Sequence, residues 1–329
     1  MTTVAVIGSN SFSGSHFVDY LLEKTNYNII GLSRSTEKNA AFLQYKKRNS
    51  PRFQFQQLNL NTDVAKIMEF FDKIQPAYVV NFAAQSEVAP SWNNPTHWYQ
   101  TNVVSLVNLL SQLKDRKYLL KYVHASTPEV YGTTSGKVTE NIIYSPSTPY
   151  AASKAAADLF IMMLVKNFNF PAALTRVANI YGPGQQLYKI IPRSVMYIKM
   201  GKKIPLHGGG RSVRAFIHAQ DASDCVLKIM EHAKPGDIYH ISQSEFVEIR
   251  ELVQRICDKM KVKFEDATLI TEDRMGKDAA YVLDSTKAKI DLGWKPEITL
   301  DQGINEVIEW VNREWDVLKN ETLEYVHKE

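Results

Sequence analysis

The chain opens with Thr3-Val-Ala-Val-Ile7, a β-branched apolar run, followed at once by Gly8-Ser-Asn-Ser11-Phe-Ser-Gly14. An amphipathic stretch at 16–22 comes next, so the expected order is strand, glycine turn and helix. In this arrangement the backbone approaches a pyrophosphate closely, and the helix N-terminus faces its negative charge. Ser11 stands where the pattern has its middle glycine, so the fingerprint is imperfect. The stretch predicts a dinucleotide-binding opening, with a plain small-residue turn as the alternative.

Further strand-like runs at 27–32, 53–58 and 78–82 alternate with helical segments. This alternation predicts an α/β fold, with a Rossmann-type doubly wound parallel sheet. After one more predicted strand at 172–180 the alternation breaks. We expect residues 1–180 to form a dinucleotide-binding domain, with a later strand near 237–242 returning to the sheet. We expect 181–329 to form mainly a smaller mixed α/β substrate-binding lobe, with the substrate in the crevice between the two parts.

A second group of residues carries the reaction chemistry. Tyr150 and Lys154 are four residues apart on a predicted helix and therefore share one face. An ammonium beside a phenol favours the phenolate, which can act as a base on an alcohol. Upstream, Ser126-Thr-Pro-Glu129 places two hydroxyls and a carboxylate at the end of an apolar run, 118–123. A Tyr/Lys pair alone fits an ordinary amphipathic helix, but together these features indicate alcohol oxidation by a nicotinamide.

Residues that follow the predicted strands are candidates for contact with the dinucleotide. The second strand ends before Arg34, without the acidic residue that would bind the ribose 2′-hydroxyl of NAD. An arginine suits a 2′-phosphate instead, so we predict NADP, with NAD as the alternative and a solvated loop arginine as the non-functional reading. Asn59 is placed to meet the adenine edge. The candidate cofactor-binding residues are Gly8, Ser11, Phe12, Gly14, Ser33, Arg34, Asn59, Leu60, Ala83, Ala84, Gln85, Tyr150 and Lys154.

These features together resemble the extended short-chain dehydrogenase/reductase family, in its nucleotide-sugar-modifying branch. The resemblance covers nearly the whole chain. The branch contains 4-epimerases, 4,6-dehydratases and decarboxylases, so the reaction has to be argued from the site. The motifs that carry the resemblance are Gly8…Gly14, Asn-Phe-Ala-Ala-Gln-Ser at 81–86, Ser-Thr-Pro-Glu-Val-Tyr-Gly at 126–132, Tyr150…Lys154, Arg-Val-Ala-Asn-Ile-Tyr-Gly-Pro at 176–183, and Arg214…Asp221.

Within this branch Glu129 favours a 4,6-dehydratase, since a simple 4-epimerase needs no carboxylate there. The resemblance implies four catalytic residues. Tyr150, helped by Thr127 and paired with Lys154, takes the 4-hydroxyl proton, and Glu129 removes the C5 proton while water leaves C6. The nicotinamide stores the C4 hydride and returns it to C6, giving a 4-keto-6-deoxy sugar, so the dinucleotide is expected to stay tightly bound. Decarboxylases also keep this glutamate, so a decarboxylase or epimerase remains the alternative, and a non-catalytic dinucleotide-binding protein a more distant one.

The nucleotide base of the substrate stays open, because this chain shares features with two kinds of 4,6-dehydratase. The dTDP-glucose 4,6-dehydratases usually carry an acidic residue where this chain has Pro128, whereas GDP-mannose 4,6-dehydratases resemble the chain in lacking it. Arg34, the 83–86 stretch and His218-Ala219 lean the same way. The segment from Arg274 to Asp284 looks closer to the dTDP-glucose enzymes. A GDP-mannose-type substrate is therefore slightly favoured.

The sugar nucleotide itself should meet residues from both predicted parts. Arg214 matches the family arginine that grips the pyrophosphate, and Asn179 matches the asparagine beside it. Arg274 is a second candidate for the same anion. His207 and His240 have no metal-ligand spacing, and no metal site is expected. The candidate substrate-binding residues are Ser86, Glu87, Thr127, Asn179, Arg214 and Arg274.

Composition bounds the partners and the compartment. The net charge of +4 is small for 329 residues and the basic residues are scattered, so no nucleic-acid partner is expected. No apolar run reaches membrane-spanning length and no basic segment precedes the first strand, so we expect a cytoplasmic protein without a membrane partner. The predicted amphipathic helices at 102–113 and 151–166 have broad apolar faces. They suggest a homodimer or a higher homo-oligomer.

Overall fold

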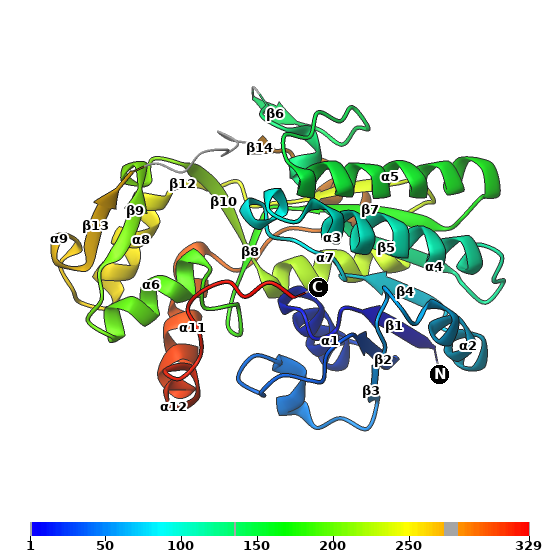
Figure 1. Ribbon diagram of the computed structural model, residues 1–329, viewed down its shortest axis with the longest axis horizontal. Helices are drawn as coiled ribbons and strands as arrows, with labels where there is room; N and C mark the ends of the chain where they lie inside the picture. Colours follow the sequence, from blue (N-terminus) through cyan, green and yellow to red (C-terminus); the bar gives the residue numbers. More distant parts are fainter. Residues whose placement is uncertain (1, 135, 273–281, 329) are drawn as a thin grey trace.

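The computed structural model describes residues 2–134, 136–272 and 282–328. Seven parallel strands form its central sheet: β1 (Thr3–Ile7), β2 (Asn28–Ser33), β3 (Phe53–Gln57), β4 (Tyr78–Asn81), β5 (Lys121–Ser126), β7 (Ala172–Val177) and β11 (Ile238–Ile241). Their order is β11-β7-β5-β4-β1-β2-β3, so the chain winds outward from β1 in both directions (Figure 1). The predicted doubly wound α/β fold is confirmed.

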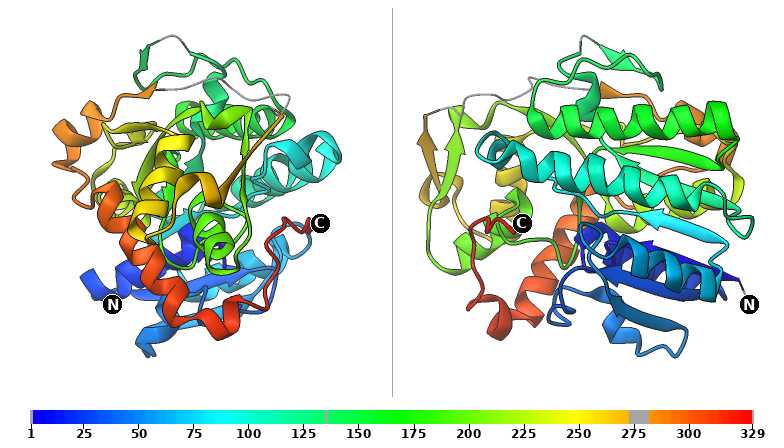
Figure 2. Two further views of the ribbon diagram at one scale, coloured as in Figure 1. Left: turned by 90° about the vertical axis from the view of Figure 1, so that its left-hand side faces the viewer. Right: turned by 45° about the vertical axis from the view of Figure 1, so that its right-hand side comes forward.

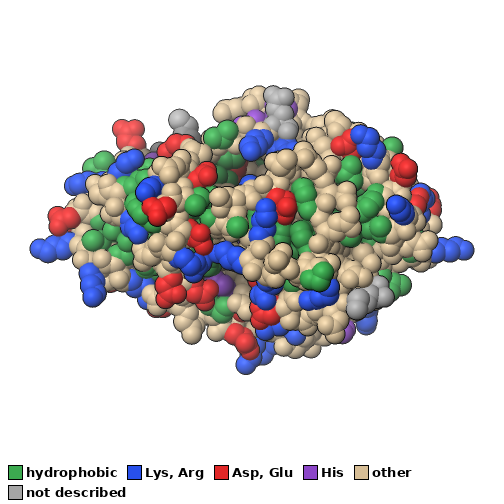
Figure 3. Space-filling model, turned by 90° about the horizontal axis from the view of Figure 1, so that it is seen from below, with side chains coloured by type: hydrophobic (Ala, Val, Ile, Leu, Met, Phe, Trp, Pro, Cys, Tyr) green, Lys and Arg blue, Asp and Glu red, His purple; other side chains and the backbone are tan. Residues whose placement is uncertain are grey.

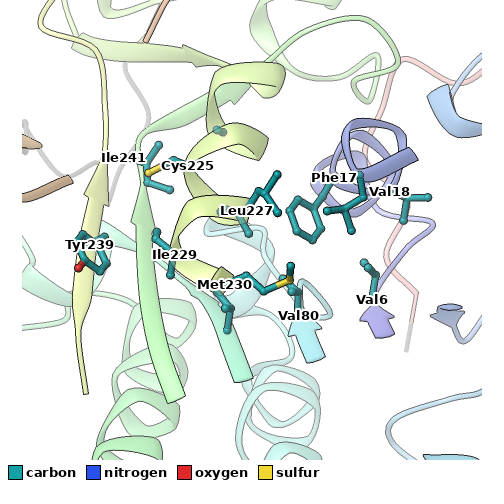
Figure 4. Packing of buried hydrophobic residues seen from close by; sticks show 14 of the residues in the cluster. Val6, Phe17, Val18, Val80, Cys225, Leu227, Ile229, Met230, Tyr239 and Ile241 are labelled. Atoms are coloured by element: carbon teal, nitrogen blue, oxygen red, sulfur yellow. The ribbon is translucent and has the colours of Figure 1, made fainter. Parts of the chain in front are cut away.

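Helices cover both faces of this sheet because successive strand residues point to opposite sides. Val4 and Val6 of β1 face α1 (Phe12–Lys24) and α7 (Ala219–His232). Figure 4 shows this layer, with Phe17 and Val18 of α1 packed beside Leu227 and Met230 of α7. Ala5 and Ile7 of β1 belong to the core on the other face. The helices of that second face are α2 (Val64–Ile74), α4 (Ser105–Leu113) and α5 (Pro149–Phe168).

The helix predicted at 102–113 is part of a longer helical run. It begins with α3 (Pro95–Tyr99), passes through a π-helical turn, η3 (Gln100–Val104), and continues as α4. Pro95 occupies the first helical turn, where the missing backbone N–H costs nothing. Single π-turns inside helices often occur at functional sites. Here the turn carries Asn102, which is part of the site described below.

The single strand predicted at 172–180 is wrong, because the chain changes sheets at Ala178. The Ala178 N–H donates to the Ile241 carbonyl at 2.9 Å, where the pairing of β7 with β11 ends. The next residues, β8 (Asn179–Tyr181), pair with a different partner, β10 (Val213–His218). With β12 (Phe246–Glu248) they form a three-stranded sheet in the order β12-β10-β8.

The remaining elements build the second lobe, whose core lies around Ile191, Leu252 and Trp310. Its C-terminal end crosses back toward the central sheet (Figure 2). The boundary at residue 180 stays a prediction. The lobe and the smaller connecting elements are α6 (Ile190–Lys199), β9 (Ile204–His207), η5 (Gly208–Gly210), α8 (Ile249–Lys259), α9 (Phe264–Ala267), β13 (Thr268–Thr271), α10 (Thr286–Leu292), α11 (Leu300–Arg313), α12 (Trp315–Leu318), η1 (Gln44–Arg48), η2 (Ala89–Trp92), η4 (Pro128–Tyr131), β6 (Lys137–Val138) and β14 (Val282–Leu283).

Two surface properties bear on the expectations from composition. On the face shown in Figure 3, Lys and Arg side chains are mixed with Asp and Glu rather than gathered into one basic patch. Within the described ranges, the helices are all too short or too polar to cross a bilayer.

Candidate functional site

The glycine turn between β1 and α1 is tied closely to its neighbours. Gly8 has a φ of +86°, a conformation that residues with a side chain avoid. Its N–H donates to the Leu32 carbonyl at 2.7 Å, and a Cβ at Gly8 would lie 2.7 Å from the backbone nitrogen of Ala83. A Cβ at Gly14 would overlap the Gly8 carbonyl oxygen. The two glycines therefore let α1 and the loop after β4 approach the turn.

Ser11 explains why the middle glycine of the fingerprint can be absent. Its φ of −74° is open to any residue, so glycine is not required. Its Oγ accepts a hydrogen bond from the Gly14 N–H at 3.0 Å and caps α1. A serine satisfies one orphan donor of the first turn and leaves the other N–H groups of that turn directed at the space in front of the helix.

A cavity of about 580 Å³ opens in front of this turn, at the carboxyl edge of β1, β2 and β4. Its size is within the range of small-molecule sites. Gly14 is not among its lining residues, because it packs against Gly8 beneath the surface. The predicted residues that line the cavity are Gly8, Ser11, Phe12, Ser33, Arg34, Asn59, Leu60, Ala83, Ala84, Gln85, Ser86 and Glu87.

The end of the cavity beside β2 is cationic. Arg34 and Lys38 both line it, while the loop carboxylate of Glu37 accepts a hydrogen bond from Tyr45 at 2.9 Å instead. Burial lowers the pKa of the Arg34 guanidinium, because the charged group has lost part of its hydration. An anionic ligand would therefore stabilise this charge more than it would a fully hydrated one. Ser33 holds the turn, since its Oγ accepts from the Asn10 N–H at 3.0 Å. The geometry of this end fits a dinucleotide, with backbone and helix N–H groups for a pyrophosphate and two cations beyond it.

Asn59 has a local role besides lining the cavity. Its Oδ1 accepts from the Asn61 N–H at 3.0 Å, and its own N–H donates to the Asp63 carboxylate at 3.0 Å. The side chain thus shapes the loop after β3, and an adenine contact for it stays a prediction.

The second part of the site centres on Lys154, which is 1% exposed. Its Nζ lies 2.7 Å from the Ala125 carbonyl and 2.9 Å from His124 Nε2. Burial lowers the pKa of Lys154 to about 8, against the opposing effect of the Asp158 carboxylate. Burial, with the Lys154 charge beside it, keeps the pKa of His124 well below its usual value, so the imidazole is neutral and accepts from the ammonium. Sequence reasoning missed His124, whose signal was its position near the end of the strand that leads to Thr127.

Tyr150 is buried in the first turn of α5, one helical turn before Lys154. The Thr148 hydroxyl caps this helix by accepting from the Ala151 N–H at 3.2 Å. The Tyr150 N–H donates to Ser91 Oγ at 3.2 Å, which ties the turn to η2 in the loop after β4. Tyr150 and Lys154 both belong to α5, the helix on which they were predicted to share a face.

Glu129 lies in η4, the short 3₁₀ turn after β5, and Thr127 is the residue that precedes this turn. Thr127 caps the turn, since its Oγ1 accepts from the Glu129 N–H at 3.3 Å and its own hydroxyl hydrogen can still be donated. Pro128 takes the first position of the turn, where its fixed φ fits. Val130 and Tyr131 of the same turn pack against Ala155 of α5. Glu129 therefore lies next to the segment that carries Lys154.

Buried hydrogen bonds connect the two parts of the site through the π-helical turn. Asn102 Oδ1 accepts from the Gln85 N–H at 2.8 Å, and its Nδ2 donates to the Gln85 carbonyl and to Ser153 Oγ, both at 2.9 Å. Gln85 lines the cavity and Ser153 precedes Lys154. Sequence reasoning did not identify Asn102 as a site residue, because an asparagine inside an amphipathic pattern carries no signal of its own.

A buried ion pair lies close to Lys154. Asp158 and Arg176 are both fully buried and 3.2 Å apart. Asp158 also accepts from Ser126 Oγ at 2.8 Å, so this hydroxyl of the predicted motif is directed at α5. Burial raises the pKa of Asp158 despite the nearby guanidinium and ammonium.

The predicted substrate residues of the second lobe do not line the cavity. Asn179 is half-buried, and its Nδ2 donates to the Ala215 carbonyl at 3.2 Å. Arg214 is half-buried on β10. Arg274 lies outside the described residues. These contacts stay predictions.

The two histidines considered for metal binding have other partners. His207 Nδ1 lies 2.9 Å from the Thr271 hydroxyl, and His240 Nε2 lies 2.7 Å from the Tyr131 hydroxyl. In the described part of the chain, His, Cys, Asp and Glu nowhere gather in threes with metal-binding geometry.

Comparison with known proteins places this chain in a family. A family model described as GDP-mannose 4,6 dehydratase matches residues 6–307. A dTDP-glucose 4,6-dehydratase of Haemophilus influenzae is 30% identical over 331 residues, covering 94% of this chain and 98% of the relative. An Escherichia coli protein of the same name is 29% identical over 95% of this chain and 94% of its own length.

Solved structures agree on the fold. DesIV, a dTDP-glucose 4,6-dehydratase of Streptomyces venezuelae solved with NAD, has a TM-score of 0.87 and 30% identity over 95% of this chain and 98% of its own. A Thermotoga maritima UDP-glucose 4-epimerase has a TM-score of 0.85 over 95% of this chain and all of its own, but at 24% identity this likeness concerns the fold alone. Together with the family match, these findings show that the chain belongs to the GDP-mannose 4,6-dehydratase family, as a nicotinamide-dependent nucleotide-sugar 4,6-dehydratase of the short-chain dehydrogenase/reductase type.

Proposed function

We propose that this chain converts dTDP-glucose to a dTDP-4-keto-6-deoxy sugar through Thr127, Glu129, Tyr150 and Lys154. The observation that carries the proposal is the packing of η4 against α5, in which Val130 and Tyr131, the two residues after Glu129, contact Ala155, the residue after Lys154. One carboxylate and one phenol from adjoining segments supply two separate bases, and a dehydration that begins with oxidation needs two.

The chain's own residues divide the proton transfers. Tyr150, its phenolate favoured by the Lys154 ammonium, takes the proton of the C4 hydroxyl while Thr127 donates a hydrogen bond to that oxygen. The resulting ketone acidifies the C5–H bond, and Glu129 removes that proton. Pro128 has no proton to give, so Glu129 passes the proton that it takes from C5 to the hydroxyl that leaves C6 as water. The proton that Tyr150 took from the C4 hydroxyl balances the proton that finally returns to C5. A bound nicotinamide dinucleotide would supply the hydride acceptor and donor that oxidation at C4 and reduction at C6 require.

For the cofactor, we propose NADP rather than NAD. The support is the Arg34 and Lys38 pair at the β2 end of the cavity, where residues 33–36 contain no carboxylate to receive a ribose 2′-hydroxyl. NAD is the alternative, because the similar DesIV and Bacillus anthracis structures were solved with NAD. Mass spectrometry of the ligand released from denatured protein distinguishes the two, and chiefly NAD would overturn the assignment.

For the substrate, the relatives favour dTDP-glucose over the GDP-mannose type that the sequence slightly favoured. The curated relatives compared above are dTDP-glucose 4,6-dehydratases at 29–30% identity over most of both chains. GDP-mannose keeps support from the family description and from Pro128. The base is therefore proposed as thymine, with guanine second.

The test is incubation of the purified protein with dTDP-glucose, GDP-mannose and UDP-glucuronate in parallel. A dehydratase yields an alkali-labile 4-keto-6-deoxy sugar that absorbs at the edge of the ultraviolet, and we expect it from dTDP-glucose. Carbon dioxide from UDP-glucuronate would indicate a decarboxylase instead, and a C4-inverted sugar without loss of water would indicate an epimerase.

We further propose a homodimer that forms through α3, α4 and α5. Several large apolar side chains of this face are solvent-exposed, among them Val104 at 46%, Leu159 at 52% and Met163 at 44%. Exposed apolar groups on adjacent helices are typical of a protein interface. Sedimentation of wild type and Leu159→Glu tests this, with a monomeric variant expected. A cytoplasmic location stays a prediction.

A further inference from the structure

The C-terminal segment, Glu321–Lys328, returns from the second lobe to the carboxyl edge of the central sheet (Figures 1 and 2). It follows α12, and Leu323 anchors its start by packing against the core of the second lobe. Nothing in the sequence marked this segment, because it has no periodicity and no motif.

The far end of the segment is held by two residues from separate strands. The Lys328 carbonyl accepts from Arg34 Nη2 at 3.0 Å and from Gln85 Nε2 at 2.5 Å. Arg34 follows β2 and Gln85 follows β4, and β1 lies between these two strands in the sheet. The segment therefore crosses above the end of β1, where the glycine turn begins.

Aromatic contacts hold the middle of the segment. His327 Nε2 lies 2.8 Å from His97 Nδ1, and the His327 ring is parallel to that of buried Trp98, with centroids 5.1 Å apart. Tyr325 packs edge-on against Tyr188 at a centroid distance of 5.5 Å. Contacts among these five rings and two hydrogen bonds to the Lys328 carbonyl hold the segment more firmly than a frayed end would be held.

The dinucleotide cavity lies between this segment and the sheet. Gly8, Ser11 and Phe12 line it on one side. With the segment in place the cavity has a volume of about 580 Å³, so space for a ligand remains beneath the segment. The cavity residues contributed by the segment are Glu321, Thr322, Glu324, Tyr325, Val326 and Lys328.

We propose that Glu321–Lys328 is a wall of the dinucleotide site that retains the bound dinucleotide by blocking its exit. The inference rests on the proposed function in one respect: a dinucleotide that ends each turnover as it began has no need to leave. Opening the exit requires loss of the Lys328 and His327 contacts. The Lys328 carbonyl and His327 together make three hydrogen bonds, and the need to break them should slow dissociation by at least about tenfold.

The first test compares the full chain with a variant that ends at Asn320. Dissociation of a pre-bound fluorescent dinucleotide analogue is followed after addition of excess unlabelled dinucleotide. We expect dissociation at least about tenfold faster from the shortened chain. Equal or slower dissociation overturns the proposal, and a slower rate would mean that the segment competes with the ligand.

Single substitutions test the same proposal in case the shortened chain does not fold. His327→Ala removes the contacts with His97 and Trp98, Tyr325→Ala removes the contact with Tyr188, and each should speed dissociation severalfold. Lys319→Ala is the matched control, because Lys319 pairs with Asp316 on the surface outside the cavity and its loss should leave the rate unchanged. Rates equal to the control for both ring variants would also contradict the proposal.

A second measurement asks how the dinucleotide affects the segment, and the two possibilities predict opposite changes. If the segment stabilises the bound dinucleotide, the dinucleotide stabilises the segment by the same factor. Saturating dinucleotide should therefore slow carboxypeptidase digestion of the C-terminus, whereas a competing segment would be digested faster. Neither measurement uses a sugar nucleotide, so a failure here and a failure of the proposed reaction are told apart.

Discussion

The two ends of the site differ in how they are built. The end that we propose to be catalytic contains three charged side chains that are at most 1% exposed and hydrogen-bonded to other residues. They are Lys154, Asp158 and Arg176. At the dinucleotide end, glycine, serine and alanine leave a cavity of about 580 Å³ bounded by loops and by the chain terminus. Buried charges must be paired, so the catalytic end is fixed before a substrate arrives. The dinucleotide end provides space and backbone donors, and its closure depends on a segment from the other lobe.

The largest expected effect comes from the catalytic end. Tyr150→Phe removes one hydroxyl and leaves the packing of α5 intact. Turnover should fall by about 10⁴-fold, near the upper limit for a general base, because oxidation precedes every later step. Turnover of the sugar nucleotide by purified protein, with circular dichroism as the check on folding, measures this. A rate within threefold of wild type would show that Tyr150 is not the base.

Glu129→Gln tests whether the two bases of that end act separately. The amide keeps size and hydrogen bonding but loses basicity, so oxidation at C4 should survive and elimination should slow by about 10²–10³-fold. Trapping a quenched reaction with borodeuteride should recover sugar labelled at C4 that still carries its 6-hydroxyl. Product formation at near wild-type rates would remove the dehydratase mechanism, and an epimerase would become the better reading.

Asp158→Asn tests whether the paired charges stabilise the catalytic end. The variant leaves the Arg176 guanidinium buried without a carboxylate, which should lower the free energy of unfolding by about 3–5 kcal/mol. Urea denaturation measures the loss. The control is Asp72→Asn, which breaks an exposed pair with Arg116 at 2.7 Å and should cost at most about 1 kcal/mol. Similar losses for both variants would mean that burial does not distinguish the two pairs.

The smallest effect concerns the pH dependence of stability. The folded pKa of Lys154 is about 8, below its ordinary value of 10.5, so between these pH values the unfolded chain binds more protons. Lys154 therefore disfavours folding below pH 8, and this penalty is relieved as the pH rises to 10.5. Wild type should gain about 1–3 kcal/mol relative to Lys154→Met over this range. If the free energies of unfolding of wild type and Lys154→Met change with pH by the same amount, Lys154 is solvated and the prediction is wrong.

The sequence predicted the elements whose signal is local. The β1 run, the glycine turn and α1 follow from residue types a few positions apart, and the structure has β1 at Thr3–Ile7 as expected. The predicted strand at 172–180 failed because its pattern stays apolar through Ala178, while the change of sheet depends on where β11 ends. Twelve of the predicted residues line the cavity because they follow β1, β2, β3 and β4, and parallel strands end at one edge.

By itself the sequence determined the doubly wound fold, the glycine turn and the Tyr150–Lys154 spacing, since each depends on periodicity or spacing within one element. The tertiary structure alone decided that His124 and Asp158 surround Lys154, that Asn102 joins the two ends, and that Lys328 lies above the glycine turn. These are contacts between residues up to 294 positions apart, as for Arg34 and Lys328. Their geometry follows from how whole elements pack, and no pattern in a single stretch of chain encodes it.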